Sequence, residues 1–490
     1  MQSPRVMVLQ PPSPPYKNVS RDWQGGFGVA AESKRSCYGH DSSLNAFPCS
    51  ALLYSLGALE EAGAEVQFVD GQVEQLDQGS ILSRIRDFEP HLLAAAISLP
   101  SLEGDLQLLD SIKRAFPAVG IAATGTVVKV LHREVLLRSK GVDMAVSGDP
   151  EVVLPHLSRE LQAGRHGFEG VPGVATRWHP ADSAEPQGSA LGDFAHGPKI
   201  PWHLLPMSRY YSTALGRPRP SATLMSSRGC PYPCSYYCPY PIGFGARMLL
   251  RDPRLVGDEL QCLCRDYGRE LILFRDQVFT FSREHSAAVC EEILSRGLSF
   301  TWFCETRLDR VDSDLLKLMK RAGCFAVHYG LESGDPELLA SVAKPGVDLG
   351  MAVASVRATK EAGLRAHLHV ILGLPDENET SLVHTAKAIR ALKPHTVNIT
   401  WATPFPGTRF WDDAEREGLF LDPVRDYACL SGKRMVVRTR CLGPEALRAA
   451  RRHWVRAIDG PLPLWFARGA ARRTVAGMRR LLHTAARRSA

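Results

Sequence analysis

Three cysteines stand close together in the segment SSRGCPYPCSYYCPYP, which covers residues 226–241. Cys230, Cys234 and Cys238 are separated by three residues each, and the glycine and prolines around them are typical of a tight loop. A structural zinc site needs four ligands, and this segment offers no fourth cysteine or histidine. The spacing therefore predicts three thiolate ligands around a metal centre that keeps an open position.

An iron–sulfur cube fits this ligand set. When three thiolates hold a [4Fe-4S] cluster, one iron is left to bind a small molecule, and the cluster can deliver one electron. S-adenosylmethionine (SAM) combines an amino-carboxylate chelator with a sulfonium group, and its reductive cleavage yields a 5'-deoxyadenosyl radical that removes hydrogen from unactivated carbon. The cysteine loop therefore predicts a [4Fe-4S] cluster and SAM as cofactors.

The elements that must position this loop lie in residues 219–411, where apolar strands alternate with helical patterns. Strands are expected at residues 221–227, 270–275, 299–304, 324–330, 365–373 and 396–402. Six successive strand and helix units imply a partial (β/α)6 barrel of the TIM type.

Polar motifs follow these strands and never directly precede them. The motifs are the cysteine loop, DQVFT with Asp276, ETR with Glu305, GLESG with Glu332, GLPDE at 373–377 and PFPGT at 404–408. Because the carboxyl ends of parallel barrel strands meet at one rim, we expect these side chains to form one site.

These motifs, in this order, resemble the radical SAM enzymes, specifically the branch with an N-terminal cobalamin-binding domain, over roughly residues 1–411. The resemblance implies that Cys230, Cys234 and Cys238 hold the cluster. It also implies SAM contacts from Tyr237, Asp276, Glu305, Glu332, Gly373 and Pro375. In this family the residue at the position of Tyr237 faces the adenine, the acidic segment of Asp276 lies near the methionine moiety, and the two glutamates contact the amino group and ribose.

The cysteine spacing departs from the family's usual pattern, which has three residues and then two between the ligands. Tyr237 stands at the usual third-ligand position, and Cys238 takes that role only if the loop bulges by one residue. Because a phenol is a poor substitute for a thiolate, we expect Cys238 to be the ligand. The alternative is a remodelled cluster that does not support radical chemistry.

Residues 1–165 are expected to form a flavodoxin-like, doubly wound parallel sheet. Apolar runs predict strands at residues 5–11, 65–70, 92–99, 120–125 and 142–148. Such a sheet binds its ligand beyond the carboxyl ends of its strands, and no G-x-G-x-x-G follows the first strand to favour a dinucleotide.

The segments FPCSALLYSLGALEEAGAEVQFVD and SGDPE resemble the cobalamin domain of this branch. The resemblance implies cobalamin bound near Ser98, Gly125, Thr126 and Gly148. The D-x-H-x-x-G signature is missing, which implies cobalt without a histidine ligand from the protein. A degenerate domain kept for packing is the alternative.

The connector and the C-terminal region show weaker hydrophobic periodicity and fewer motifs than the two domains. Residues 166–218 are expected to be an extended connector, and residues 412–490 a helical, arginine-rich extension. Of the net charge of +7, eleven arginines and one acid lie from residue 446 onward, so the basicity belongs to the tail. Residues 471–490 suit an amphipathic helix, whose arginines either face solvent or contact a nucleic acid or membrane.

His367 and His369 alternate along one predicted strand and therefore share a face. They offer either a base to the substrate or a hydrogen-bonded barrel lining. His328, on the preceding strand, is expected to be a core residue.

Twelve cysteines without the density of a secreted scaffold, no leader peptide and no apolar stretch of membrane-spanning length predict a cytoplasmic protein without a membrane span. The resemblance implies an enzyme that methylates an unactivated carbon of a small molecule: one SAM methylates cobalt, a second gives the radical, and a flavodoxin or ferredoxin supplies electrons.

Two alternatives stay open. Relatives with these motifs also carry out ring closure, oxygenation or rearrangement. The RNA-modifying methylthiotransferases carry three further N-terminal cluster cysteines and a C-terminal β-barrel, whereas only Cys37 and Cys49 are available here, so a nucleic-acid partner is disfavoured.

Overall fold

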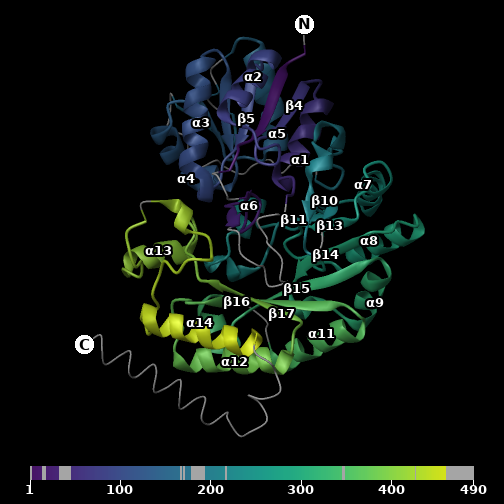
Figure 1. Ribbon diagram of the computed structural model, residues 1–490, viewed down its shortest axis with the longest axis vertical. Helices are drawn as coiled ribbons and strands as arrows, with labels where there is room; N and C mark the ends of the chain where they lie inside the picture. The colour runs from purple at the N-terminus through teal and green to yellow at the C-terminus, as the bar shows by residue number, and fades with distance from the viewer. Residues whose placement is uncertain are drawn as a thin grey trace. The chain divides into compact units, whose positions relative to one another are not determined.

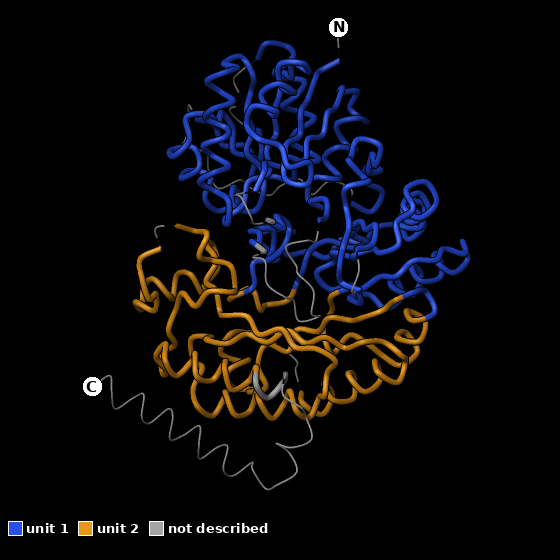
Figure 2. Tube along the Cα trace, in the orientation of Figure 1, with its two compact units in different colours: residues 1–231, 238–304, 321–323 blue, residues 232–237, 305–320, 324–490 orange. Residues whose placement is uncertain are grey.

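The computed structural model describes residues 3–13, 18–31, 46–165, 168, 171–177, 194–215, 218–344, 348–424 and 426–459. The chain divides into two compact units, coloured in Figure 2. Unit 1 holds residues 1–231, 238–304 and 321–323, and unit 2 holds residues 232–237, 305–320 and 324–490. Within the described residues, no helix combines the length and apolar character needed to cross a membrane.

Unit 1 begins with a six-stranded sheet in the order β4-β1-β5-β6-β7-β8. Its strands are β1 (Arg5–Gln10), β4 (Glu65–Asp70), β5 (Leu92–Ala96), β6 (Gly120–Thr124), β7 (Met144–Val146) and β8 (Val174–Thr176). The first five strands of this order are parallel and match the five predicted ones. Their near-continuous apolar runs are buried, as expected for strands covered on both faces.

Helices cover this sheet on both sides (Figure 1). They are α1 (Ser50–Glu61), α2 (Gln78–Phe88), α3 (Leu102–Ala115), α4 (Thr126–Arg138) and α5 (Pro150–Gln162). Helix α1 contacts α5, and α2 contacts α3, as in a doubly wound fold. A short hairpin of β2 (Asn18–Ser20) and β3 (Val29–Ala31) follows β1.

The segment expected to be an extended connector contributes to the sheet. Strand β8 pairs antiparallel with β7, and the backbone N–H groups of Ser147 and Gly148 both donate to the Gly173 carbonyl. Three residues are too few to show a period of two, so this edge strand could not be predicted from the sequence. Later in the connector, β9 (Tyr211–Ser212) pairs antiparallel with β10 (Arg219–Leu224).

The first half of the barrel sequence also lies in unit 1. Strand β13 (Leu271–Phe274) pairs in parallel with β10 on one side and β14 (Thr301–Thr306) on the other. Helices α7 (Pro253–Arg265) and α8 (Arg283–Ser295) follow β10 and β13 and contact each other. The loop after β10 holds the short pair β11 (Ser227–Arg228) and β12 (Leu249–Leu250), with α6 (Tyr240–Phe244) between them.

Unit 2 contains β15 (Cys324–Glu332), β16 (Arg365–Leu372) and β17 (Thr396–Trp401), which pair in parallel. Helices α11 (Leu349–Glu361) and α12 (Glu379–Leu392) cover one face of these strands (Figure 1). Ala366, Leu368 and Val370 of β16 are fully buried. All six predicted barrel strands are therefore present.

The remaining helices of unit 2 are α9 (Ser313–Arg321), α10 (Pro336–Ser341), α13 (Arg409–Arg416) and α14 (Pro444–Asp459). Helix α14 agrees with the helical character predicted for the C-terminal extension. The arginine-rich helix predicted at residues 471–490 lies outside the described residues.

Candidate active site

The cysteine loop begins at Gly229, directly after β11, and this position requires a glycine. Gly229 has φ +99°, and a Cβ there would lie 1.8 Å from the Arg247 carbonyl oxygen. Its N–H donates to Gln277 Oε1 at 2.7 Å, and the Cys230 N–H donates to the Gly245 carbonyl at 3.0 Å. Cys230 is buried and Cys238 is half-buried, and both belong to unit 1. The backbone around Cys230 is thus fixed by contacts that a side chain at position 229 would break.

Asp276 anchors the entry to this loop. Its carboxylate accepts hydrogen bonds from the backbone N–H groups of Ser226 and Ser227, at 2.8 and 3.0 Å, and from the Ser226 hydroxyl at 2.6 Å. Burial raises the pKa of Asp276 to about 7, although these hydrogen bonds oppose the rise. The predicted SAM contact is therefore a fully buried acid that already holds the cysteine segment in place.

Cys234 and Tyr237 belong to unit 2, together with the 3-10 turn Pro233–Tyr236 between them. Tyr236 stacks on Phe410 with ring centroids 5.9 Å apart, and its hydroxyl donates to Asp413 Oδ2 at 2.9 Å. Tyr237 is 9% exposed. The tyrosines around Cys234 thus fix the turn by packing and hydrogen bonding.

Two buried cations act on Cys234. Burial lowers the pKa of Arg307, but Asp309 and the negative charges of Tyr232 and Cys234 raise it, and the balance is upward. The pKa of Lys344 follows the same pattern: burial lowers it, but Glu332 and then Cys234 raise it further. Cationic surroundings favour the thiolate, which is the form that binds metal. Arg307 and Lys344 therefore make Cys234 suited to bind a metal as a thiolate.

Glu332 ends β15 in a strained conformation. Its φ is +62°, and the pairing of β15 with β16 shifts register between Gly330 and Glu332. Its Oε1 lies 3.0 Å from Lys344 Nζ, and both side chains are almost wholly buried. A Cβ at Gly330 would lie 2.4 Å from the same oxygen, so this glycine is needed for the close approach. Lys344 was missed in the sequence because it follows a helix and no strand.

The other predicted SAM contacts also lie in unit 2. Glu305 is half-buried at the end of β14. Gly373, with φ +98°, donates its N–H to Glu377 Oε2, and the Pro375 carbonyl accepts from Arg440 N at 2.8 Å. Burial raises the pKa of Glu377 to about 8, and its Oε1 has no hydrogen-bond partner among the described residues. Glu377, the last residue of the GLPDE motif, thus holds the first residue of the same motif, Gly373, through a buried hydrogen bond.

In the N-terminal sheet, the predicted cobalamin contacts lie beyond the carboxyl ends of the strands. The Ser98 hydroxyl is buried and lies 3.2 Å from Arg21 Nη1, which forms an ion pair of 2.7 Å with Asp105. The Thr126 hydroxyl donates to the Gly25 carbonyl at 2.7 Å. Residues 18–31 therefore lie against this edge. This segment was missed in the sequence, although the run QGGFG at 24–28 is a signal that could have indicated a close backbone approach.

The other two predicted contacts are glycines that allow tight packing. Gly125 has φ +115°, and a Cβ there would lie 2.7 Å from the Ile97 carbonyl oxygen. A Cβ at Gly148 would lie 2.9 Å from Val153 Cγ2. The acids that follow Gly148 form ion pairs with Arg228, which stands two residues before Cys230: Glu151 binds Nη1, and Asp149 lies 3.4 Å from Nη2. The SGDPE motif is thus connected to the cysteine loop within unit 1.

Residues just after Cys238 also contact the edge of this sheet. Lys129 Nζ donates to the Gly243 carbonyl at 2.9 Å. A Cβ at Gly243 would lie 1.9 Å from the Gly25 carbonyl oxygen, and one at Gly25 would lie 2.6 Å from Pro239. Residues 239–243 and the carboxyl end of β6 are therefore parts of one packed body.

Two family models match the sequence. The model described as the Radical SAM superfamily matches residues 224–389, and the B12 binding domain matches residues 45–158. The chain belongs to the cobalamin-dependent radical SAM enzymes. The two domains of this enzyme imply a [4Fe-4S] cluster, SAM and cobalamin as its cofactors, as predicted.

Relatives of this radical SAM enzyme carry methyltransferase and cyclase names. The uncharacterized methyltransferase PH0819 of Pyrococcus horikoshii is 27% identical over 357 residues, which are 73% of this chain and 76% of that protein. The anaerobic magnesium-protoporphyrin IX monomethyl ester cyclase of Cereibacter sphaeroides is 25% identical over 380 residues, which are 75% of this chain and 60% of the cyclase. The enzyme resembles the methyltransferase-like branch of its family.

Among solved structures, the radical SAM methyltransferase TsrM of Kitasatospora setae matches with a TM-score of 0.68 and 17% identity, and the match covers 100% of both chains. That structure has cobalamin and a [4Fe-4S] cluster bound. The match confirms the predicted fold class, a doubly wound cobalamin-type domain followed by a partial radical SAM barrel.

A histidine cluster lies on one face of β15 and β16 in the radical SAM domain. His328 is in register with His367, and Gly330 with His369. Three ring nitrogens, one from each histidine, all lie within 4.8 Å of one another. His328, which was expected in the core, is half-buried and belongs to this cluster. The sequence revealed the alternation of His367 and His369 but not the register that adds His328.

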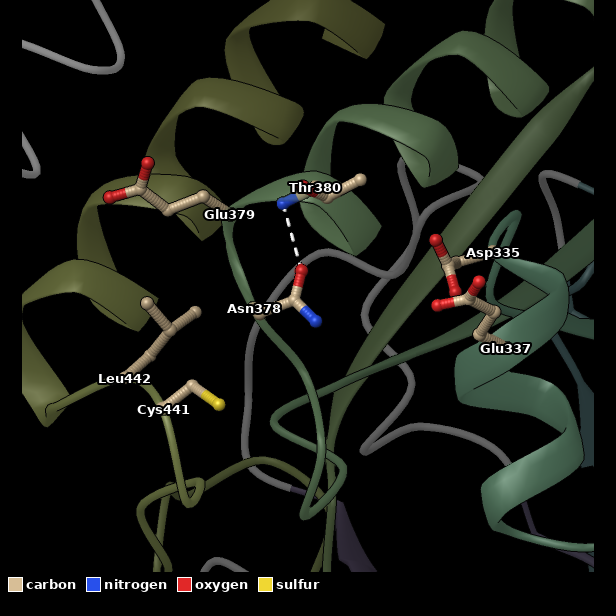
Figure 3. Close-up of a pocket in the computed structure, with 7 residues that line it drawn as sticks. All are labelled: Asp335, Glu337, Asn378, Glu379, Thr380, Cys441 and Leu442. Carbon is tan, nitrogen blue, oxygen red and sulfur yellow. Dashed lines mark hydrogen bonds between the residues drawn. The ribbon is translucent and has the colours of Figure 1, made fainter.

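A pocket of about 420 Å³ lies between the N-termini of α10 and α12 (Figure 3). It is lined by Asp335, Glu337, Asn378, Glu379, Thr380, Cys441 and Leu442. None of the predicted cofactor contacts lines it. Three of these residues are carboxylates, and two, Asp335 and Asn378, cap α10 and α12. We assign this pocket no part in the chemistry.

Proposed function

We propose that this enzyme methylates an unactivated carbon of a small-molecule substrate. When bound, the cluster and SAM supply a 5'-deoxyadenosyl radical, and cobalamin supplies the methyl group. The observation that carries the proposal is the packing of residues 239–243 on Gly25 and Lys129, at the carboxyl end of β6. This contact fixes the end of the cysteine loop to the edge where a doubly wound sheet binds its ligand.

We propose that residues of this chain bind iron, SAM and cobalamin. Cys230, Cys234 and Cys238 bind iron as thiolates, which the charges of Arg307 and Lys344 favour at Cys234. Because the loop must stay reduced, we place the enzyme in the cytoplasm, with a flavodoxin or ferredoxin as electron donor.

For SAM, we propose contacts from Tyr237, Asp276, Glu305, Glu332, Gly373 and Pro375. Lys344 Nζ contacts one carboxyl oxygen of Glu332, and we propose that the second oxygen accepts from an amino or hydroxyl group of SAM. Asp276 acts by holding the backbone of Ser226 and Ser227, which lead into the loop. For cobalamin, we propose contacts from Ser98, Gly125, Thr126 and Gly148, which follow the carboxyl ends of β5, β6 and β7.

The test uses SAM labelled with ¹³CD₃ in the methyl group. The reconstituted enzyme is incubated anaerobically with labelled SAM, a reductant and a small-molecule extract of the source cells, and products are separated by mass. We expect 5'-deoxyadenosine together with a product that carries the label. Formation of 5'-deoxyadenosine without a labelled product would overturn methylation, and absence of 5'-deoxyadenosine would overturn radical chemistry.

A second function is favoured by one observation, the similarity to the cyclase of Cereibacter sphaeroides over 75% of this chain. In that case the same residues would serve a radical ring closure or oxygenation without methyl transfer. The experiment above separates the two, because a product changed in mass but free of label supports this alternative.

A further inference from the structure

The histidine cluster has the composition of a metal site that none of the assigned cofactors uses. The ring centroids of His328 and His367 lie 4.5 Å apart, those of His367 and His369 4.7 Å, and those of His328 and His369 5.6 Å. The three residues come from two adjacent, hydrogen-bonded strands, so the backbone fixes their spacing. Three imidazole nitrogens bound to one ion at about 2.0–2.1 Å are at most about 4.2 Å apart. One nitrogen of each ring already lies within 4.8 Å of the others, so small rotations of the side chains would bring all three onto an ion.

His367 is the buried member, with 2% of its surface exposed. Its Nδ1 lies 2.5 Å from Thr396 Oγ1 on β17, and this contact orients the ring. A neutral imidazole whose second nitrogen is hydrogen-bonded is the usual form of a histidine ligand.

His369 supplies an independent observation. Its Nε2 is buried and has no hydrogen-bond partner among the described residues, while its Nδ1 lies 3.4 Å from Asn398 Nδ2. The oxygen and nitrogen of an amide are assigned from the surroundings, so Asn398 can equally turn its oxygen toward an Nδ1–H. A buried ring nitrogen without a partner costs free energy, and a bound metal ion would remove that cost.

We propose that His328, His367 and His369 bind a divalent transition-metal ion, such as Zn²⁺ or Fe²⁺. Three neutral nitrogen ligands suit these ions, and three protein ligands leave at least one position for water or a substrate oxygen. Thr396 and Asn398 orient the two rings on β16. None of its ligands lies in residues 226–241, and the proposal does not depend on the proposed function.

The test uses the full-length holoenzyme, stripped of loosely bound metal and given one equivalent of Zn²⁺. X-ray absorption at the zinc edge separates this ion from the iron and cobalt of the cofactors. We expect a nitrogen shell at about 2.0–2.1 Å with the signature of imidazole. A sulfur shell at about 2.3 Å, which means zinc on cysteines, or no zinc uptake, would overturn the site.

Variants locate the ion. His369→Leu, at a half-buried position, should weaken zinc affinity at least about tenfold, while His395→Gln, at an exposed position, should leave it unchanged. Circular dichroism and retained cobalamin check the fold of both variants. Equal zinc affinity in His369→Leu would contradict the proposal. If in addition its turnover fell, the cluster would serve the substrate and hold no metal. Zinc binding is read without SAM, so failure here leaves methylation untouched.

Discussion

Lys344 Nζ lies 3.0 Å from Glu332 Oε1, and both side chains are almost completely removed from solvent. This ion pair holds Glu332, the last residue of β15, in its left-handed conformation. The positive charge of Lys344 also interacts with Cys234. A buried ion pair costs desolvation, but losing one partner costs more, because the other charge is left alone.

Lys344→Met is expected to destabilise the protein by about 3–5 kcal/mol, because it leaves Glu332 charged and unpaired. It should also weaken SAM binding. Lys317→Met is the control, since Lys317 is exposed and its ion pair with Asp314 contributes little. Thermal unfolding and SAM binding by equilibrium dialysis measure both effects. Equal stability of Lys344→Met and Lys317→Met would show that the buried pair has no structural role.

Gly330→Ala should disturb the same pair without changing any charge. The added Cβ would lie 2.4 Å from Glu332 Oε1 and 3.1 Å from Lys344 Nζ, so the two groups must move. We expect a loss of SAM affinity of about tenfold or more, in line with displacing a charge-assisted contact. Gly443→Ala, where a Cβ meets nothing within 4 Å, is the matched control. Unchanged SAM affinity in Gly330→Ala would remove Glu332 from the SAM site.

Glu377 should make stability depend on pH. Burial raises its pKa from 4.5 to about 8 in the folded protein, so the folded state favours the protonated acid. This stability is fully present below pH 4.5 and is lost as the pH rises toward 8, at up to about 1.4 kcal/mol per pH unit. Glu377→Gln removes this titration. The melting temperature of the variant should therefore rise relative to wild type between pH 6 and 8.5, whereas parallel curves would contradict the assignment.

Gly26→Ala tests the edge where cobalamin is proposed to bind. Gly26 has φ +85°, and a Cβ there would lie 2.2 Å from the Thr126 hydroxyl, which holds Gly25. We expect cobalamin affinity to fall about tenfold or more while iron content is kept, because the strain is confined to this edge. Gly104→Ala, at an open helical position, should bind cobalamin as wild type does. Full cobalamin binding by Gly26→Ala would place the cofactor elsewhere.

The sequence predicted the strands well because buried parallel strands appear as apolar runs, as in LLAAA of β5 and LILF of β13. It failed where a feature depends on pairing between distant segments. Strand β8 has three residues, and its role depends on β7. The motif acid Glu332 was recognised by type, but its partner Lys344 stands in no motif.

The same limit applies to the histidines. The period of two placed His367 and His369 on one face, as the structure confirms, because alternation is a property of one strand. His328 joins them only through the register of β15 against β16. Register depends on the packing of both strands, and one strand's sequence does not contain it.

The central claim is that three thiolates hold an iron cube with one open corner. Mössbauer spectroscopy and iron analysis of anaerobically prepared protein test it most directly, with Cys238→Ala compared with Cys262→Ala, whose cysteine lies on α7. We predict a [4Fe-4S] signal in wild type and Cys262→Ala, and its loss in Cys238→Ala. No cube in wild type, or unchanged iron in Cys238→Ala, would contradict the account.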